Sequence, residues 1–217
     1  MLRRTLLATG LLPALVQAQG GSALPLVAAA ARGDTREVRR LLDAGAPVNA
    51  RDASGRNAAL AATQGGHVAS ALLLISRGAD VNAQDQRRDS VFLLAGADGL
   101  TEIVRAALAA GADLASTNRY GGTALIPACH RGHVDTVRLL LGTAIDVDHV
   151  NDLGWTALLE AVILGDGGPR YVEIVRLLLA HRANPNLADR HAATPLQHAR
   201  QRGLGDIARL LQAAGGR

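Results

Sequence analysis

Glycine recurs in this chain at a fixed interval of 33 residues. The longest series consists of Gly33, Gly66, Gly99, Gly132 and Gly165, and a second series of Gly45, Gly78 and Gly111. Self-similarity at such a period is the signature of repeat architectures, in which each unit packs mainly on its neighbours. The two series therefore predict a stacked solenoid rather than a domain built around one central core.

The period divides the chain into six units. After Gly165 the step lengthens to 38 residues and ends at Gly203, so the fifth unit carries five extra residues. We expect these to form a longer loop between the two helices of that unit, around residues 165–169. The predicted units are 22–52, 53–85, 86–118, 119–151, 152–189 and 190–217.

Each unit is expected to contain two short helices and an extended loop. In the fourth unit, the sequence predicts a helix over 123–132, capped by Thr123 and stopped by Gly132. A second helix over 133–141 has apolar residues at core spacing, and a loop with turn residues follows at 144–154. Helices of about nine residues are not stable alone in water, so each must pack on its neighbours. We therefore predict an all-α fold.

The composition agrees with this fold class. The chain has 42 alanines and 35 leucines but only four aromatic residues, Phe92, Tyr120, Trp155 and Tyr171. Alanine is the best helix former, whereas strands of sandwiches and barrels use aromatic and β-branched residues. The scarcity of aromatic side chains makes Tyr120 and Trp155, one unit apart at loop tips, candidates for partner contacts.

The motifs within the units resemble those of ankyrin-repeat proteins. Thr194-Pro195-Leu196 with Ala199 matches the first-helix signature, and Gly66-His67 and Gly132-His133 match the turn between the helices. Residues 45–49 and 78–82 match the exit loop. The resemblance covers about residues 23–215 and implies helix-turn-helix units joined by β-hairpin-like loops. Residues 118–211 also resemble uncharacterised bacterial ankyrin proteins that carry an export signal.

Two hairpins depart from the family pattern. Arg87-Arg88 in the third unit and His191-Ala192 in the sixth stand where the turn glycine is usual. Each of these hairpins is therefore expected either to be irregular or to bind something.

The N-terminal segment has the layout of an export signal. Arg3 and Arg4 precede an apolar run from about Thr5 to Val16, and residues 16–18 suit a cleavage site. We predict a signal peptide over 1–18 and a mature repeat domain over 19–217, acting in the bacterial periplasm. The Arg pair resembles that of a twin-arginine signal, although the residues around it match only in part, so the export route stays open. The alternative to export is an amphiphilic tail on a cytoplasmic protein.

The charge balance argues against nucleic-acid binding. All 23 cationic residues are arginines, against 19 acidic residues, and the formal net charge is only +4. A nucleic-acid interface requires a clustered, strongly basic face. We expect no membrane span in the mature chain, because the apolar N-terminal run is shorter than the roughly 20 residues a span needs.

Few residues suggest chemistry. Cys129, His130 and His133 include soft metal ligands, but a closed zinc site needs four, and Cys129 and His133 occupy packing and turn positions. Glu160 is the one acid in an apolar setting. It is expected to make a capping or inter-repeat hydrogen bond, and the alternative is an enzyme or ligand-binding site with His130 and the 165–169 loop. We predict no cofactor and no metal.

The resemblance implies a non-enzymatic domain that binds a partner protein, and we expect it to be a monomer. In that family the hairpin tips and the first-helix residues facing them form a concave contact surface. Carried onto this sequence, the contact residues are Arg56, Arg87, Arg119, Tyr120, His130, Arg131, Leu153, Trp155, Ile163, Leu164, Arg190 and His191, with Ser54, Gln64, Gln86, Asp89, Asp98 and Arg202 beside them. Trp155 has the alternative of packing along the stack of hairpins. Self-assembly is a further alternative function.

Overall fold

The computed structural model describes residues 23–217, and the predicted signal peptide over 1–18 lies outside this range. Within residues 23–217 the chain forms twelve helices and no strand. The helices are α1 (Ala23–Ala31), α2 (Thr35–Asp43), α3 (Ala58–Gln64), α4 (Val68–Ser76), α5 (Val91–Ala97), α6 (Thr101–Ala109), α7 (Leu125–His130), α8 (Val134–Leu141), α9 (Ala157–Leu164), α10 (Pro169–Ala180), α11 (Pro195–Gln201) and α12 (Gly205–Ala213). The prediction of an all-α repeat solenoid is confirmed.

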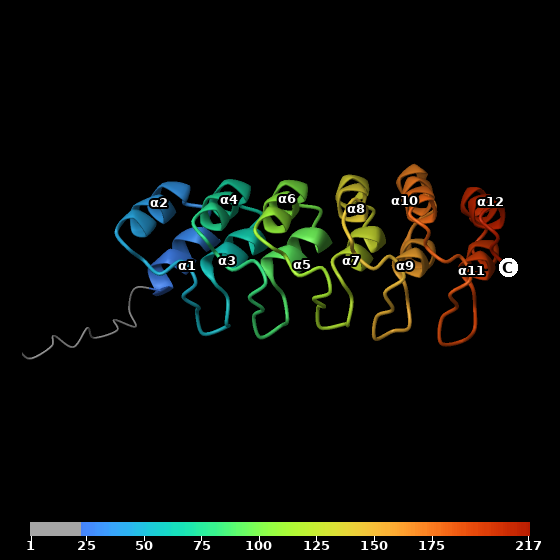
Figure 1. Ribbon diagram of the computed structural model, residues 1–217, viewed down its shortest axis with the longest axis horizontal. Coiled ribbons are helices and arrows are strands. Elements are labelled where there is room, and N and C mark those ends of the chain that lie inside the picture. The colour runs from blue at the N-terminus through green and yellow to red at the C-terminus, as the bar shows by residue number, and fades with distance from the viewer. Residues whose placement is uncertain (1–22) are drawn as a thin grey trace, which may run out of the picture.

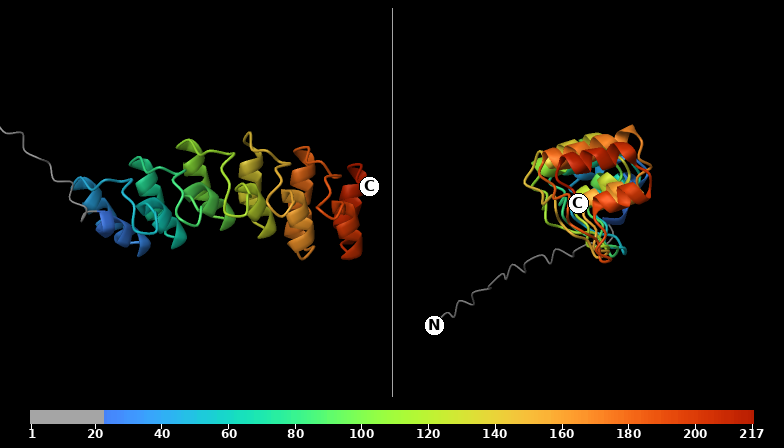
Figure 2. Two further views of the ribbon diagram at one scale, coloured as in Figure 1. Left: turned by 90° about the horizontal axis from the view of Figure 1, so that it is seen from below. Right: turned by 90° about the vertical axis from the view of Figure 1, so that its right-hand side faces the viewer.

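The helices form two parallel rows. The odd-numbered helices make an inner row, the even-numbered helices make an outer row, and the loops between units extend together beyond the inner row (Figure 1). Viewed from one end, the helices of each row overlap, the two rows stay separate, and the loops gather on one side (Figure 2). Each helix packs mainly on its partner and on the matching helices of adjacent units. This arrangement places the hairpin tips and the inner row on one surface.

The core is built from small and branched aliphatic side chains at repeated positions. One position of the inner row is occupied in successive units by Leu26, Ala59, Phe92, Leu125, Leu158 and Leu196, each at most 1% exposed. In this series Ala59 of the second unit is followed by Phe92 of the third unit. We infer that the ring of Phe92 fills the space that the short Ala59 leaves, because interiors are packed without large voids.

One polar side chain fixes each hairpin. The first residue of the turn is Asp or Asn, and its side chain accepts hydrogen bonds from the backbone N–H groups two and four residues later, as is typical of such turns. The residues in this position are Asp52, Asp85, Asn118, Asn151 and Asp189, with acceptor distances between 2.8 and 3.1 Å.

The hairpins without the turn glycine are regular, so the first of the two expectations for them, an irregular hairpin, is wrong. The Asp85 N–H donates to the Asp89 carbonyl at 2.9 Å, which is the bond that Asp52 and Arg56 make in the second unit. Arg88 and Ala192 adopt the positive φ of the missing glycines, 61° and 60°. For a residue with a Cβ this conformation costs about 1–2 kcal/mol, and the fixed hairpin imposes it.

Asparagines bridge adjacent units at the base of the hairpins. The Asn82 Nδ2 donates to the Gly111 carbonyl at 2.9 Å, and its Oδ1 accepts from the Asp113 N–H at 2.8 Å. Asn49 makes the matching pair of bonds one unit earlier. Ala115 occupies this position in the third unit, so the junction between the third and fourth units lacks the bridge.

The fourth unit does not begin its first helix as predicted. Asn57, Ser90, Thr156 and Thr194 each accept a hydrogen bond from the N–H three residues later. Thr123 does not cap, and α7 begins only at Leu125. The reason is Pro127, which has no N–H to donate to the Thr123 carbonyl as Glu160 donates to that of Thr156. The Thr123 hydroxyl is buried without a hydrogen-bond partner among the described residues.

This difference gives a matched pair of variants. Thr156→Val should lower the free energy of unfolding by about 1 kcal/mol, because the bond from the Leu159 N–H is lost. Thr123→Val should leave stability unchanged or raise it slightly, because a buried hydroxyl without a partner is replaced by a methyl group of the same shape. Urea denaturation of both variants measures the difference. Equal losses would show that Thr123 also caps its helix.

The insertion in the fifth unit mainly lengthens a helix, and the predicted longer loop is longer by only one residue than the loop 131–133 of the fourth unit. Only residues 165–168 separate α9 from α10, and α10 has 12 residues where α8 has 8. Pro169 at the first helical position favours this earlier start. Tyr171 consequently takes the place that His133 has in the fourth unit, and its hydroxyl donates to the His130 carbonyl at 2.8 Å.

Candidate partner-binding groove

An open groove of about 440 Å³ lies between the hairpins and the inner helices of units three to five. We call it the central groove. Seven of the twelve predicted contact residues line it: Arg87, Arg119, Tyr120, His130, Arg131, Leu153 and Leu164. They come from α7, from the end of α9 and from three successive hairpins. The 33-residue register brings them together, because equivalent positions of stacked units face the same side.

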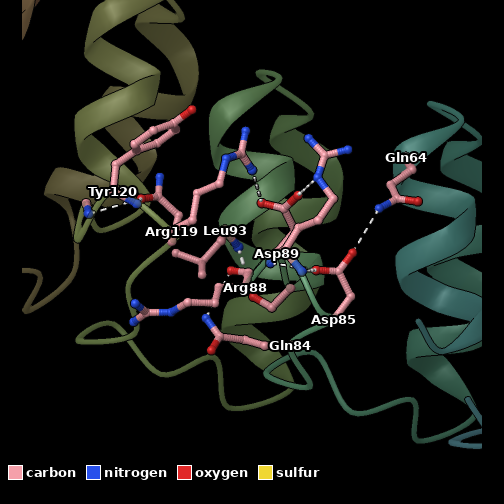
Figure 3. Close-up of polar contacts among 12 residues, drawn as sticks. Gln64, Gln84, Asp85, Arg88, Asp89, Leu93, Arg119 and Tyr120 are labelled. Atoms are coloured by element: carbon pink, nitrogen blue, oxygen red, sulfur yellow. Dashed lines mark hydrogen bonds and ion pairs between the residues drawn. The ribbon is translucent and has the colours of Figure 1, made fainter. Parts of the chain in front are cut away.

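The hairpin side of the groove is basic. Asp89 lies between two arginines, with Arg119 Nη1 at 3.5 Å and Arg87 Nε at 3.8 Å from its carboxylate (Figure 3). Burial raises the pKa of Asp89, against the opposing effect of Arg119. The Arg119 guanidinium also lies 4.8 Å from the centre of the Tyr120 ring. Two arginines therefore share one carboxylate, which leaves excess positive charge at this end.

Apolar side chains are exposed beside these charges. Tyr120 is 54% exposed, Leu153 49% and Leu164 41%. At the opposite wall, Arg131 pairs with Asp98 and donates to the Ala97 carbonyl at 3.1 Å. Exposed aromatic and aliphatic side chains rimmed by arginine are typical of interaction surfaces.

Glu160 forms a polar centre in the floor of the groove. Glu160 is only 5% exposed, and its Oε1 accepts a hydrogen bond from Asn151 Nδ2 at 3.0 Å. Its Oε2 faces His130 Nδ1 at 3.4 Å. Burial raises the pKa of Glu160 to about 7, and the Asn151 hydrogen bond opposes that shift. Burial, together with the nearby Arg131, lowers the pKa of His130.

The sixth unit shows what is unusual about this centre. Asp189 and His198 occupy the positions of Asn151 and Glu160, and His198 Nε2 lies 2.8 Å from the Asp189 carboxylate. There an acid is matched by a base. In the fifth unit the amide of Asn151 stands opposite the acid Glu160. The Glu160 carboxylate therefore has no cationic partner on its own hairpin.

Five predicted contact residues lie outside the lining of the groove. Arg56 is bonded to Asp52 and Gln64, and Arg190 donates to the Asp152 carbonyl. His191 is exposed at its hairpin tip. Trp155 and Ile163 are half-buried. As binding residues, all twelve remain predictions.

The two soft ligands beside His130 are not arranged as a metal site. Cys129 is fully buried in the core, and burial, with a smaller effect of Glu160, raises the pKa of its thiol. His133 is half-buried beneath Gly99 at the turn between helices. Within residues 23–217 no three His, Cys, Asp or Glu side chains are grouped to hold a metal ion. None of the helices in that range is both long and apolar enough to cross a membrane.

Several lining residues do not follow from the sequence motifs. The motifs indicate only a turn role for Asn151, and they assign no binding role to Leu94, Ile126 and Pro127. The signal that could find them is the register, because Leu94, Pro127 and Glu160 each follow the first residue of the preceding hairpin by nine positions.

The chain belongs to the ankyrin-repeat family. The family profile described as "Ankyrin repeats (3 copies)" matches residues 7–85 and 92–189, so its first match begins inside the predicted signal segment. YahD of Escherichia coli (strain K12), described as a putative ankyrin repeat protein, is 54% identical over 56 residues, which are 26% of this chain and 28% of YahD. The match thus spans just over a quarter of that relative.

Solved structures agree over nearly the whole repeat domain. An ankyrin repeat domain from Acinetobacter baumannii AYE is 53% identical with a TM-score of 0.86, covering 89% of this chain and 98% of that one. The ankyrin repeat protein EF0377 is 40% identical with a TM-score of 0.84, covering 88% and 97%. The ankyrin repeat domain of Bcl-3, a member of the IkappaB family, is 28% identical with a TM-score of 0.77, covering 89% and 86%. Domains of this fold are generally protein-interaction modules and typically non-enzymatic scaffolds.

Proposed function

We propose that this protein is a non-enzymatic interaction module of the bacterial periplasm that binds a partner protein through the central groove. The observation that carries the proposal is the convergence of exposed Tyr120, Leu153 and Leu164 with three arginines over adjoining units. Tyrosine and arginine are among the residues most often found at the centres of interfaces. The partner is proposed to be a protein segment that lies along the groove across units three to five.

Catalysis at Glu160 and His130 has weaker support. The two side chains do meet, as the enzymatic alternative requires. However, the neighbouring thiol of Cys129 is buried in the core, and the groove is open. A site that must exclude water from a reaction is usually enclosed.

The groove is tested by site-specific photocrosslinking in the native bacterium. A photoreactive phenylalanine analogue at position 120 or 164 should crosslink one and the same partner. The analogue at position 105, an exposed residue on the outer helix α6, is the control and should not. Crosslinking of the same partner from position 105 alone would place the interface on the other face.

The double variant Tyr120→Ala with Leu164→Ala should reduce recovery of that partner at least tenfold, because two central contacts are removed. The melting temperature should stay within a few degrees, since both side chains are largely exposed. Val150→Ala is the matched control, because Val150 is 50% exposed but lies outside the groove lining. If the double variant binds as well as the control, the groove is not the interface.

Export is tested on the untagged chain. We expect osmotic shock to release a mature protein whose mass corresponds to a start at Gln19, because residues 16–18 suit cleavage. Replacing Arg3 and Arg4 with lysine should retain the precursor in the cytoplasm if the twin-arginine route is used. A full-length, uncleaved chain in the cytoplasm of the wild-type strain would contradict the periplasmic proposal.

A further inference from the structure

We infer that the partner segment places a basic side chain, lysine or arginine, against Glu160 in the floor of the central groove. This inference rests on the proposed function and states the chemistry of the partner. Its basis is the position of Glu160, which lines the groove although only 5% of the residue is exposed.

The hydrogen bonds of Glu160 leave one oxygen available. Oε1 accepts from Asn151, whereas Oε2 accepts no hydrogen bond from the described residues and has only the ring of His130 at 3.4 Å. A carboxylate has lone pairs for about four hydrogen bonds, and a buried one is costly without donors. A lysine ammonium or an arginine guanidinium entering the groove would supply those donors and the opposite charge.

The surrounding charges favour a cation at this place. Each arginine of the groove already lies beside an acid, with Arg131 paired to Asp98 and with Arg119 and Arg87 sharing Asp89. Glu160 is the acid of the groove without an arginine. An acidic side chain of the partner would instead be directed to the hairpin end, where Arg87 and Arg119 share one carboxylate.

Glu160 is faced by few other titratable groups. From α7 come His130, Arg131 and the buried Cys129, and the hairpin contributes the neutral Asn151. Directly after α11, Arg202 donates to the carbonyls of Val162 and Gly165, and on α11 His198 is paired with Asp189. On α10, the Tyr171 hydroxyl is bonded to the His130 carbonyl. His130 is therefore the one titrating side chain in contact with the Glu160 carboxylate among these groups.

The ionisation of Glu160 makes the contact depend on pH. Because burial raises the pKa of Glu160 to about 7, the carboxylate is mostly protonated at pH 6 and mostly ionised at pH 8. A cationic side chain binds the ionised form. Its affinity should therefore be about tenfold higher at pH 8 than at pH 6, and this gain should disappear in Glu160→Gln.

The test uses a display library of random twelve-residue peptides selected at pH 8 against the chain 19–217. Binders that are lost on Tyr120→Ala with Leu164→Ala are taken as groove binders. We expect them to share a basic residue. Replacing it with an uncharged analogue, which is norleucine in the case of lysine, should weaken binding to the wild-type chain at least tenfold. On Glu160→Gln the same replacement should have little effect. Asp206→Asn, an exposed acid on α12, is the control and should behave as wild type.

The outcomes separate the two proposals. Groove binders without a shared basic residue, or a norleucine effect that is equal on wild type and Glu160→Gln, would overturn the inference about Glu160 alone. Binders enriched in acidic residues would show that Arg87 and Arg119 provide the recognition. If no selected peptide depends on Tyr120 and Leu164, the proposed function of the groove fails.

Discussion

Replacing Phe92 with alanine is expected to lower the free energy of unfolding by about 3–5 kcal/mol. Phe92 is 0% exposed and is among the largest fully buried side chains of the described residues. Its removal leaves a cavity beside Ala59, which is too short to fill the space. The inner row continues on both sides of α5, so the helix cannot move inward to close the gap without disturbing its neighbours.

Phe92→Leu is the matched control. Leucine stands at the same position in four other units, so this variant should lose no more than about 1.5 kcal/mol. Urea denaturation followed by circular dichroism measures both. Because repeat arrays can unfold in parts, the midpoint and the slope should be compared together. A loss below about 1 kcal/mol for Phe92→Ala would show that the third unit is loosely packed.

Glu160→Gln is expected to raise stability at neutral and alkaline pH. The pKa of Glu160 is raised from 4.5 to about 7 in the folded chain, so the folded state holds its proton more strongly than the unfolded state. This contribution is fully present below pH 4.5 and is lost as the pH rises through 7. A shift of this size corresponds to about 3 kcal/mol. Glutamine keeps an oxygen for the Asn151 amide but cannot ionise.

The measurement is the free energy of unfolding of both chains from pH 4.5 to pH 8. The two curves should lie close together at the acidic end and diverge above about pH 5, with the variant more stable by up to about 3 kcal/mol at pH 8. Glu102→Gln, at an exposed position of α6, is the control and should change little. Parallel curves for wild type and Glu160→Gln would show that the buried carboxyl is stabilised by something other than protonation.

The repeat pattern predicts the fold well because it fixes both the helices and their neighbours. A glycine interval of 33 residues sets which residues face the same side, and this register alone is enough to place Arg87, Tyr120 and Leu153 at equivalent positions of successive hairpins. Departures inside single units are harder to predict. The late start of α7 depends on the absent N–H at Pro127, and the insertion forms helix because Pro169 favours a helix start.

The candidate site is less accessible from the sequence than the fold. Glu160 can be recognised as an acid in an apolar helix, but not as the floor of a groove, because that depends on which neighbours leave it uncovered. The exposure of Trp155 is equally hard to predict, because a position at a hairpin tip does not decide it. Trp155 is half-buried and lies outside the groove lining. Burial of a single side chain depends on the width of the space between hairpin and helix, which the repeat period does not specify.

Because Ala115 lacks the asparagine bridge, the packing of the third unit on the fourth at the groove should depend on ionic strength. The junction between the third and fourth units is held at the groove by Arg119 with Asp89 and by Arg131 with Asp98, where the two preceding junctions have uncharged amide bridges. Exposed ion pairs weaken as salt screens them, whereas amide hydrogen bonds respond far less. Added salt should therefore weaken the contacts that hold this joint at the groove, and the arginines that would meet a partner would be released from their internal acids at the same time.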